Sequence, residues 1–154
     1  MPSNTYRSAM DTAIRLLAQR DHTRRELQWK LAKRGIADEV VQGVLTECEG
    51  LNYLDDTRAA QHYAGELQRK GYGCRHIRMA LKKKGVNALT IEQTLADCNA
   101  DDWEQAAADN AFQKKRRRFD REPDQRKRRE KIYRFLHSRG FSSDVIWDVI
   151  HRWE

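Results

Sequence analysis

Hydrophobic residues recur along the chain every three or four positions, the spacing that places them on one face of an α-helix. In the stretch 27–48 these positions are Leu27, Leu31, Val41, Val44, Leu45 and Cys48. No stretch alternates apolar and polar residues as a half-buried strand does, and the chain lacks the Asn-Gly and Asp-Gly pairs typical of hairpins. The pattern predicts an all-α protein.

The stretch 27–48 recurs twice further along the chain. It reads LQWKLAKRGIADEVVQGVLTEC, its first counterpart begins 50 positions later at Ile77, and the second begins a further 55 positions later at Ile132. Another helical segment precedes each copy, at 9–19, 56–68 and 102–117. Because a unit of about 50 residues has too small a core to be stable alone, we expect the units to stack. The sequence predicts an elongated array of three tandem three-helix repeats.

Glycine and proline mark the expected helix ends. Gly35, Gly85 and Gly140 each follow basic residues and occupy the position after a helix where a positive φ is favoured. Pro123 should end the first helix of the third repeat. The resulting division is an N-terminal tail at 1–8 and repeats at 9–50, 51–100 and 101–154.

Residues with capping side chains precede several expected helices. Thr23 and Glu26 match a capping box, and Asn87 and either Ser142 or Ser143 can cap helices that follow the glycines. These start signals agree with the helix boundaries that the apolar spacing predicts.

Two acid pairs, Asp55-Asp56 and Asp101-Asp102, are the clearest candidates for catalysis. Paired carboxylates can hold magnesium for phosphoryl transfer or nuclease chemistry. Both pairs stand at the start of an expected helix, however, where capping and the helix dipole explain them. We interpret Asp55 and Asp101 as caps, and expect no catalytic residue, no bound metal and no cofactor.

Histidine, cysteine and tryptophan are assigned structural positions. The histidines lack the spacing of a metal site, so we expect surface or cap positions for His22, His62, His76, His137 and His151. Cys48 and Cys98 occupy equivalent apolar positions of the repeat and are expected in the core. We expect Trp29, Trp147 and Trp153 in the core or at contacts between repeats.

Composition excludes several classes of protein. The 154 residues are 39% hydrophobic, which is enough for a folded core and excludes a disordered tail protein. No run approaches the roughly 18 apolar residues of a membrane span, and no secretory signal follows Met1, so we expect a soluble cytoplasmic protein. Three cysteines without a C-x-x-C pair should be reduced.

The net charge of +7 hides a segregation of charge along the chain. Residues 15–34, 67–91 and 114–139 carry net charges of +5, +7 and +9, whereas 38–56 and 92–109 carry −6 each. If the repeats stack in similar orientation, their basic helices form a stripe suited to a polyanion. The alternative is that these runs are solvated faces, or that the acidic segments pair with basic ones in neighbouring repeats.

We expect the cations of these basic helices to contact nucleic acid or a nucleoprotein filament. They are Arg24, Arg25, Lys33, Arg34, Arg69, Lys70, Arg75, Arg78, Lys82, Lys83, Lys84, Lys114, Lys115, Arg116, Arg117, Arg118, Arg126, Lys127, Arg128 and Arg129. Single-stranded and double-stranded DNA are both candidate partners, and we expect the protein to act as a monomer away from membranes.

The central part of the chain resembles a known family. Tyr53-Leu54-Asp55-Asp56, Arg58, Tyr63-Ala64, Lys70-Gly71-Tyr72-Gly73, Arg75, Ile77, Leu81 and Lys84-Gly85-Val86 are similar to the signature of the RecX regulators of the RecA recombinase. The segments Ala13-Ile14-Arg15-Leu16-Leu17, Asp21-His22-Thr23, Glu26-Leu27 and Lys30-Leu31 resemble the opening of that family. Asn52 stands where a glycine is usual, and Ala59 where an aromatic residue is usual.

The resemblance implies a non-enzymatic regulator. Such proteins consist of three-helix tandem repeats that lie along the groove of the RecA filament on single-stranded DNA. They restrain its ATP hydrolysis, strand exchange and coprotease activity. Two other functions remain open from the residues alone: a generic architectural or regulatory DNA-binding protein that reads the major groove with a helix, and a helical scaffold that binds only protein.

Overall fold

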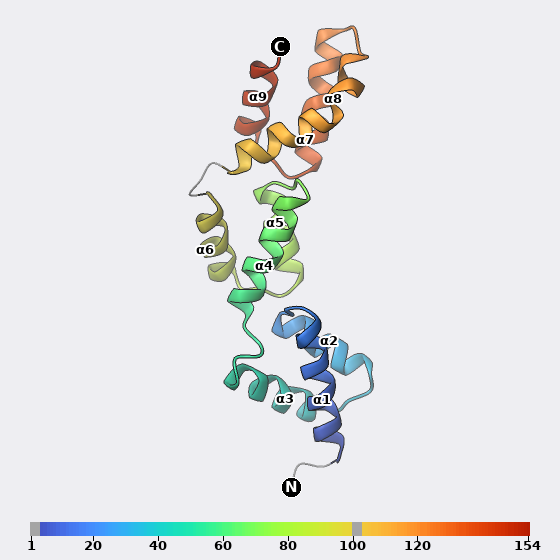
Figure 1. Cartoon of the computed structure of the whole chain (residues 1–154), viewed down its shortest axis with the longest axis vertical. Coiled ribbons are helices and arrows are strands. Elements are labelled where there is room, and N and C mark those ends of the chain that lie inside the picture. The colour runs from blue at the N-terminus through green and yellow to red at the C-terminus, as the bar shows by residue number, and fades with distance from the viewer. Residues whose placement is uncertain (1–3, 100–102) are drawn as a thin grey trace. The chain divides into compact units, whose positions relative to one another are not determined.

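The structure, a computed structural model, describes residues 4–99 and 103–154, and these form nine α-helices and no strand. The helices are α1 (Asn4–Gln19), α2 (Arg24–Lys33), α3 (Asp38–Gly50), α4 (Asp56–Arg69), α5 (Cys74–Lys83), α6 (Ala88–Asn99), α7 (Trp103–Asp120), α8 (Gln125–Ser138) and α9 (Ser143–Arg152) (Figure 1). The all-α prediction is confirmed, although α1 begins at Asn4 rather than at Ala9. Within the described ranges, no helix is long and apolar enough to cross a membrane.

The chain divides into two compact units. Unit 1 comprises Met1–Tyr63 and Leu81–Ile91, and unit 2 comprises Ala64–Ala80 and Glu92–Glu154. In unit 1, α1, α2 and α3 contact one another and bury a core. Leu27 and Leu31, one turn apart on α2, are fully buried there, and each such side chain stabilises the fold by about 2 kcal/mol.

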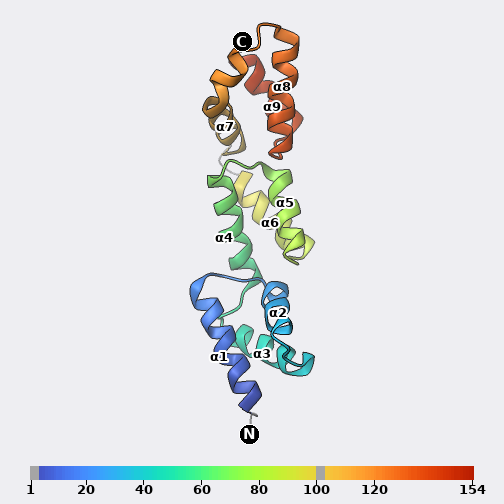
Figure 2. The ribbon, with the colours of Figure 1, turned by 90° about the vertical axis from the view of Figure 1, so that its right-hand side faces the viewer.

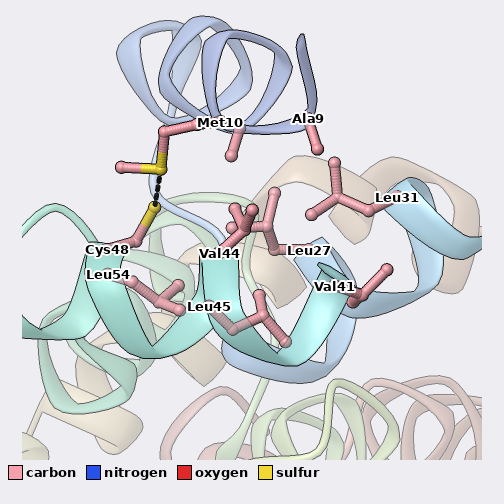
Figure 3. Packing of buried hydrophobic residues seen from close by; sticks show 10 residues of the cluster. Ala9, Met10, Leu27, Leu31, Val41, Val44, Leu45, Cys48 and Leu54 are labelled. Carbon is pink, nitrogen blue, oxygen red and sulfur yellow. Dashed lines mark hydrogen bonds between the residues drawn. The ribbon is translucent and has the colours of Figure 1, made fainter. Parts of the chain in front are cut away.

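Cys48 lies in this first core, as predicted. In Figure 3 its thiol, on α3, points toward Met10 on α1, and the Sγ–Sδ distance is 3.9 Å. Burial raises the pKa of the Cys48 thiol, which keeps it protonated and unreactive. The side chain of the equivalent Cys98 lies outside the described residues, as do Asp101 and Asp102 with the cap predicted there.

In unit 2, α7, α8 and α9 contact one another, and Figure 2 shows α8 and α9 side by side. Leu136, Phe141 and Ile146 are fully buried, at the repeat positions that sequence periodicity assigned to the core. Phe112 and Phe119 of α7 stack with ring centroids 5.8 Å apart. The core residues of the third repeat therefore occupy the same repeat positions as those of the first. The third core differs in containing buried phenylalanine side chains.

The predicted helix-end signals are confirmed. Gly35, Gly85 and Gly140 have φ values of 82°, 83° and 91°. The capping box of α2 is complete, and the side chains of Asn87, Ser142 and Asp55 accept hydrogen bonds from backbone N–H groups at their helix starts. α7 ends at Asp120 and α8 begins at Gln125, so the break falls around Pro123.

Asn52 adopts a left-handed backbone conformation with φ of 60° in the turn after α3. Asparagine is among the few residues other than glycine that tolerate this region, because its short amide can form local hydrogen bonds. The turn geometry expected of a glycine is therefore retained with asparagine in its place.

The tryptophan predictions are wrong in part. Trp29, Trp147 and Trp153 are 61%, 42% and 40% exposed, so none is a core residue. Trp29 is two positions from both Leu27 and Leu31, which on a helix is the opposite face. Trp153 still packs against Phe112, with ring centroids 6.3 Å apart, and Trp147 packs against Tyr133 at 5.6 Å.

The prediction for His22 is also wrong, because its side chain is 1% exposed. Its Nδ1 lies 3.0 Å from the Arg20 carbonyl oxygen, and its Nε2 lies 2.8 Å from the Lys30 ammonium. This geometry fits a neutral ring with the proton on Nδ1. Burial lowers the pKa of His22, and the charges of Arg20 and Lys30 act in the same direction. The exposed positions of His62, His137 and His151 agree with expectation.

Candidate nucleic-acid interface

A cavity of about 360 Å³ lies in unit 1, where the side of α2 meets the end of α5. Arg25, Glu26, Trp29 and Lys30 of α2 line it, together with Lys83 and Lys84. The hydroxyl of Thr23, the cap of α2, donates a hydrogen bond to the Lys84 carbonyl oxygen at 2.5 Å. This bond fastens the carboxyl end of one helix to the start of another and brings their cations together.

Glu26 is the single acid among the described residues that line this cavity, and it is already engaged. Its carboxylate lies 3.1 Å from Arg20 and 3.5 Å from Lys84, and it accepts a hydrogen bond from the Tyr63 hydroxyl at 3.2 Å. Burial alone would raise the pKa of Glu26, but the Thr23 N–H, Arg20 and Lys84 together hold it below its usual value. The carboxylate is thus ionised, and it already interacts with Arg20, Lys84 and Tyr63 of unit 1.

Lys84 differs from its neighbours Lys82 and Lys83. Its ammonium lies 3.8 Å from the centre of the Tyr63 ring as well as beside Glu26, and its side chain is 29% exposed. Lys82 and Lys83 are exposed and make no ion pair with any residue that the structure describes. Lys84 therefore holds unit 1 together, whereas Lys82 and Lys83 are available to a partner.

A second cationic cavity, of about 110 Å³, lies within unit 2. Its cations come from the end of α4, from α7 and from the turn after α8: Arg69, Lys70, Lys114, Lys115 and Arg139. No carboxylate among the described residues lines it. Of the cations in this group, Lys70 pairs with Glu66 at 3.0 Å, and Arg139 donates to the Lys70 carbonyl oxygen at 3.2 Å. Arg69, Lys114 and Lys115 keep their charge uncompensated.

A larger cavity of about 740 Å³ runs along α8 and reaches Trp147 of α9. Its cations are more fully compensated than those of the other two cavities. Arg126 pairs with Glu130 at 3.4 Å, and Arg129 pairs with Glu154. The Tyr133 hydroxyl is 2.7 Å from Ser143 Oγ. This region resembles a solvated, salt-bridged helix face more than a concentrated cationic site.

The structure separates the predicted binding residues into three groups. Those with an acid partner are Arg24, Lys70, Arg78, Lys84, Arg116, Arg126 and Arg129. Arg75 and Arg128 donate to backbone carbonyl oxygens. The exposed cations whose side chains have no ion pair or hydrogen bond within the described chain are Arg25, Lys33, Arg34, Arg69, Lys82, Lys83, Lys114, Lys115, Arg117, Arg118 and Lys127.

Pairing between acidic and basic segments thus accounts for part of the charge segregation, but the pairs lie within one repeat and not between neighbouring repeats. Arg24 pairs with Glu49 at 2.7 Å, and Arg78 pairs with Glu92 at 2.9 Å. Sequence reasoning missed Lys30 and Arg139 as cavity cations and Trp29 as an exposed aromatic beside them. The helical phase of Trp29 relative to Leu27 and Leu31 is the signal that could have found it.

Within the described residues, no cluster of His, Cys, Asp and Glu could hold a metal ion.

The fold and these cavities define a protein of tandem three-helix domains that presents cations free of acid partners. Three family models match the chain: the first three-helix domain of RecX at 9–48, the second at 55–95 and the third at 102–150. The chain belongs to the RecX family.

Relatives of known name agree with this assignment. The protein named Regulatory protein RecX from Cronobacter sakazakii is 33% identical over 98% of this chain and 95% of its own length. The protein of the same name from Serratia proteamaculans is 34% identical over 91% and 94%. The crystal structure of RecX from Lactobacillus salivarius has the same fold, with a TM-score of 0.85 at 22% identity over 97% of both chains.

Proposed function

We propose that this protein binds a RecA–DNA filament and restrains its ATP hydrolysis, strand exchange and coprotease activity, without catalysing a reaction itself. Membership of the RecX family supports this role, because the relatives of this chain are named regulatory proteins. We expect it to act in the cytoplasm as a monomer and to need no cofactor.

The observation that carries the proposal is the cationic cavity of unit 2. Arg69, Lys114 and Lys115 converge there without an acid partner among the described residues. Like charges held together lower the stability of the free protein, so such a cluster is favoured where an anion neutralises it. Phosphates of a DNA backbone provide that anion, and the released counterions make binding depend on salt.

Other exposed cations add to the positive charge of each unit taken by itself. Lys82 and Lys83 in unit 1, and Arg117 and Arg118 in unit 2, are exposed without partners in the part of the chain that the structure describes. Cations that already pair, such as Arg78 and Arg129, contribute less, because a phosphate would have to displace a carboxylate.

Co-sedimentation with RecA filaments on single-stranded DNA tests the proposal, together with a titration of filament ATP hydrolysis. The variant Lys114→Gln/Lys115→Gln should bind and inhibit about tenfold less well at moderate salt. A matched control removes the same net charge at exposed positions outside the cavities, as Arg7→Gln/Arg121→Gln, and should behave like the parent.

The other functions give different results in the same assay. A generic DNA-binding protein would bind naked DNA with a sequence preference and gain nothing from the recombinase. A protein-only scaffold would bind the filament with no affinity for naked DNA and no steep salt dependence. A parent protein that sediments with neither filament nor DNA would overturn the proposal.

A further inference from the structure

Trp29 is the most exposed Phe, Tyr or Trp of the described residues, at 61%. Leu27 and Leu31 on the opposite face are fully buried and fix the orientation of α2. An indole held in water on a rigid helix loses the hydrophobic stabilisation that burial would give it. Tryptophan is one of the residues enriched at the hot spots of binding surfaces.

The surroundings of Trp29 are strongly cationic. Arg25 and Lys33 lie one turn before and one turn after it on α2, and the Lys33 ammonium is 4.7 Å from the ring centroid. Trp29 also lines the 360 Å³ cavity of unit 1 with Arg25, Lys30 and Lys83. The acid of this cavity, Glu26, is occupied by Arg20, Lys84 and Tyr63.

An aromatic ring flanked by uncompensated cations is suited to one class of ligand in particular. Single-stranded nucleic acid offers a flat base and a phosphate on every residue, and proteins bind it by stacking bases on aromatic rings above a cationic groove. Double-stranded DNA keeps its bases stacked internally and does not offer them. The volume of the cavity lies within the range of small-molecule pockets.

We propose that Trp29 is a stacking platform for a base of single-stranded DNA, with the phosphates on either side held by Arg25, Lys33 and Lys83. The Lys33 ammonium occupies one face of the indole, and the base stacks on the other. This inference rests on the proposed function, since it names the DNA contact that unit 1 makes.

The test compares a single-stranded oligothymidylate with an abasic oligonucleotide that has the same number of phosphates. Trp29→Ala should lower the affinity for the oligothymidylate about tenfold, which is the effect of removing one stacked base. The same variant should bind the abasic strand as the parent does. The salt dependence should not change with either strand, because tryptophan carries no charge.

Two variants serve as controls. Trp29→Phe keeps an aromatic face and should lose less affinity than Trp29→Ala. Leu89→Ala removes another exposed apolar side chain of unit 1, 70% exposed and absent from the cavity lining, and should bind like the parent. Circular dichroism and thermal unfolding should be unchanged in all three, because neither position is buried.

Equal reductions in affinity for both strands, or no reduction for either, would overturn the stacking platform. Unchanged oligonucleotide binding combined with weaker filament inhibition would also overturn it, and would assign Trp29 to a protein contact. A failure of the proposed function looks different, because the parent itself would then gain no affinity from the recombinase filament and would not restrain its ATP hydrolysis, whatever its affinity for the oligonucleotide.

Discussion

Two equivalent junctions between consecutive repeats are built with different chemistry. In unit 1, the start of α2 meets the turn after α5, and the Thr23 hydroxyl donates to the Lys84 carbonyl oxygen. In unit 2, the start of α5 meets the turn after α8, and the Gly73 N–H donates to the Arg139 carbonyl oxygen at 2.9 Å. Thr23 and Gly73 are 50 positions apart, so they occupy the same place in the repeat.

The comparison shows that equivalent positions of the repeat can be joined by different interactions. The first junction adds an ionic network around Glu26, with Arg20, Lys84 and Tyr63 as partners. The second brings two backbones into contact, and Arg75 N–H also donates to the Gly140 carbonyl oxygen at 3.1 Å. We therefore expect the first junction to respond to pH and charge, and the second to respond to backbone bulk.

The largest effect is expected for Gly73→Ala. A Cβ at this position would lie 2.5 Å from the Gly140 carbonyl oxygen, which is backbone and cannot rotate away. The junction must open and break its hydrogen bonds, so the free energy of unfolding should fall by about 3 kcal/mol. Urea denaturation measures this change.

Gly50→Ala is the matched control for this substitution. Gly50 is the last residue of α3, has no left-handed φ, and a Cβ there meets no atom within 4 Å. The change should be neutral or stabilise the protein by up to about 1 kcal/mol, because alanine favours the helix. If Gly73→Ala is as harmless as Gly50→Ala, the close backbone approach does not contribute to stability.

The helix ends of both junctions were predictable because they depend on neighbouring residues. A glycine such as Gly140 ends its helix through local backbone preference, and Thr23 and Glu26 are three positions apart. The partners across each junction were not predictable, because Glu26 and Lys84 are 58 positions apart and meet only after folding. The free or paired state of each cation therefore required the structure. Trp29 was misplaced because it was counted with the apolar positions of the repeat, although it lies on the face of α2 opposite Leu27 and Leu31.

The next effect concerns His22, which lies beside the first junction. Its pKa is lowered in the folded protein, so below its usual value of 6.5 the unfolded state binds the proton more readily. Unfolding then takes up a proton, and stability falls as pH drops below 6.5. The decrease should be at most about 1.4 kcal/mol for each pH unit.

Unfolding midpoints measured between neutral and mildly acid pH test the role of His22. His22→Gln should flatten this pH dependence, whereas His151→Gln, at an exposed position, should leave it intact. An unchanged slope in His22→Gln would show that another group causes the acid sensitivity.

A smaller effect is expected for Glu26→Gln, which removes the charge from the first junction but keeps an acceptor for the Thr23 N–H. The pKa of Glu26 is lowered on folding, so its stabilisation is present above the usual value of 4.5 and disappears as pH falls through the lower folded value. The variant should be about 1 kcal/mol less stable at neutral pH, because exposed partners are screened by solvent. In acid the two proteins should converge, and equal stability at neutral pH would contradict the network.

The smallest effect on stability is expected for the double variant Lys82→Gln/Lys83→Gln. Comparing it with Lys84→Gln is the most informative test of binding. Lys82→Gln/Lys83→Gln changes exposed side chains without partners among the described residues, so stability should stay within about 0.5 kcal/mol of the parent. Each phosphate that the variant no longer neutralises should reduce the slope of log affinity against log salt by about 0.7 for single-stranded DNA. Lys84→Gln should instead weaken the first junction, because Glu26 and Tyr63 then lose the Lys84 ammonium and keep only Arg20 as a cationic partner. Titrations of single-stranded DNA and of filament ATP hydrolysis at several salt concentrations measure both effects. If the double variant keeps the parent slope while remaining folded, Lys82 and Lys83 form a solvated face and DNA binds elsewhere on the protein.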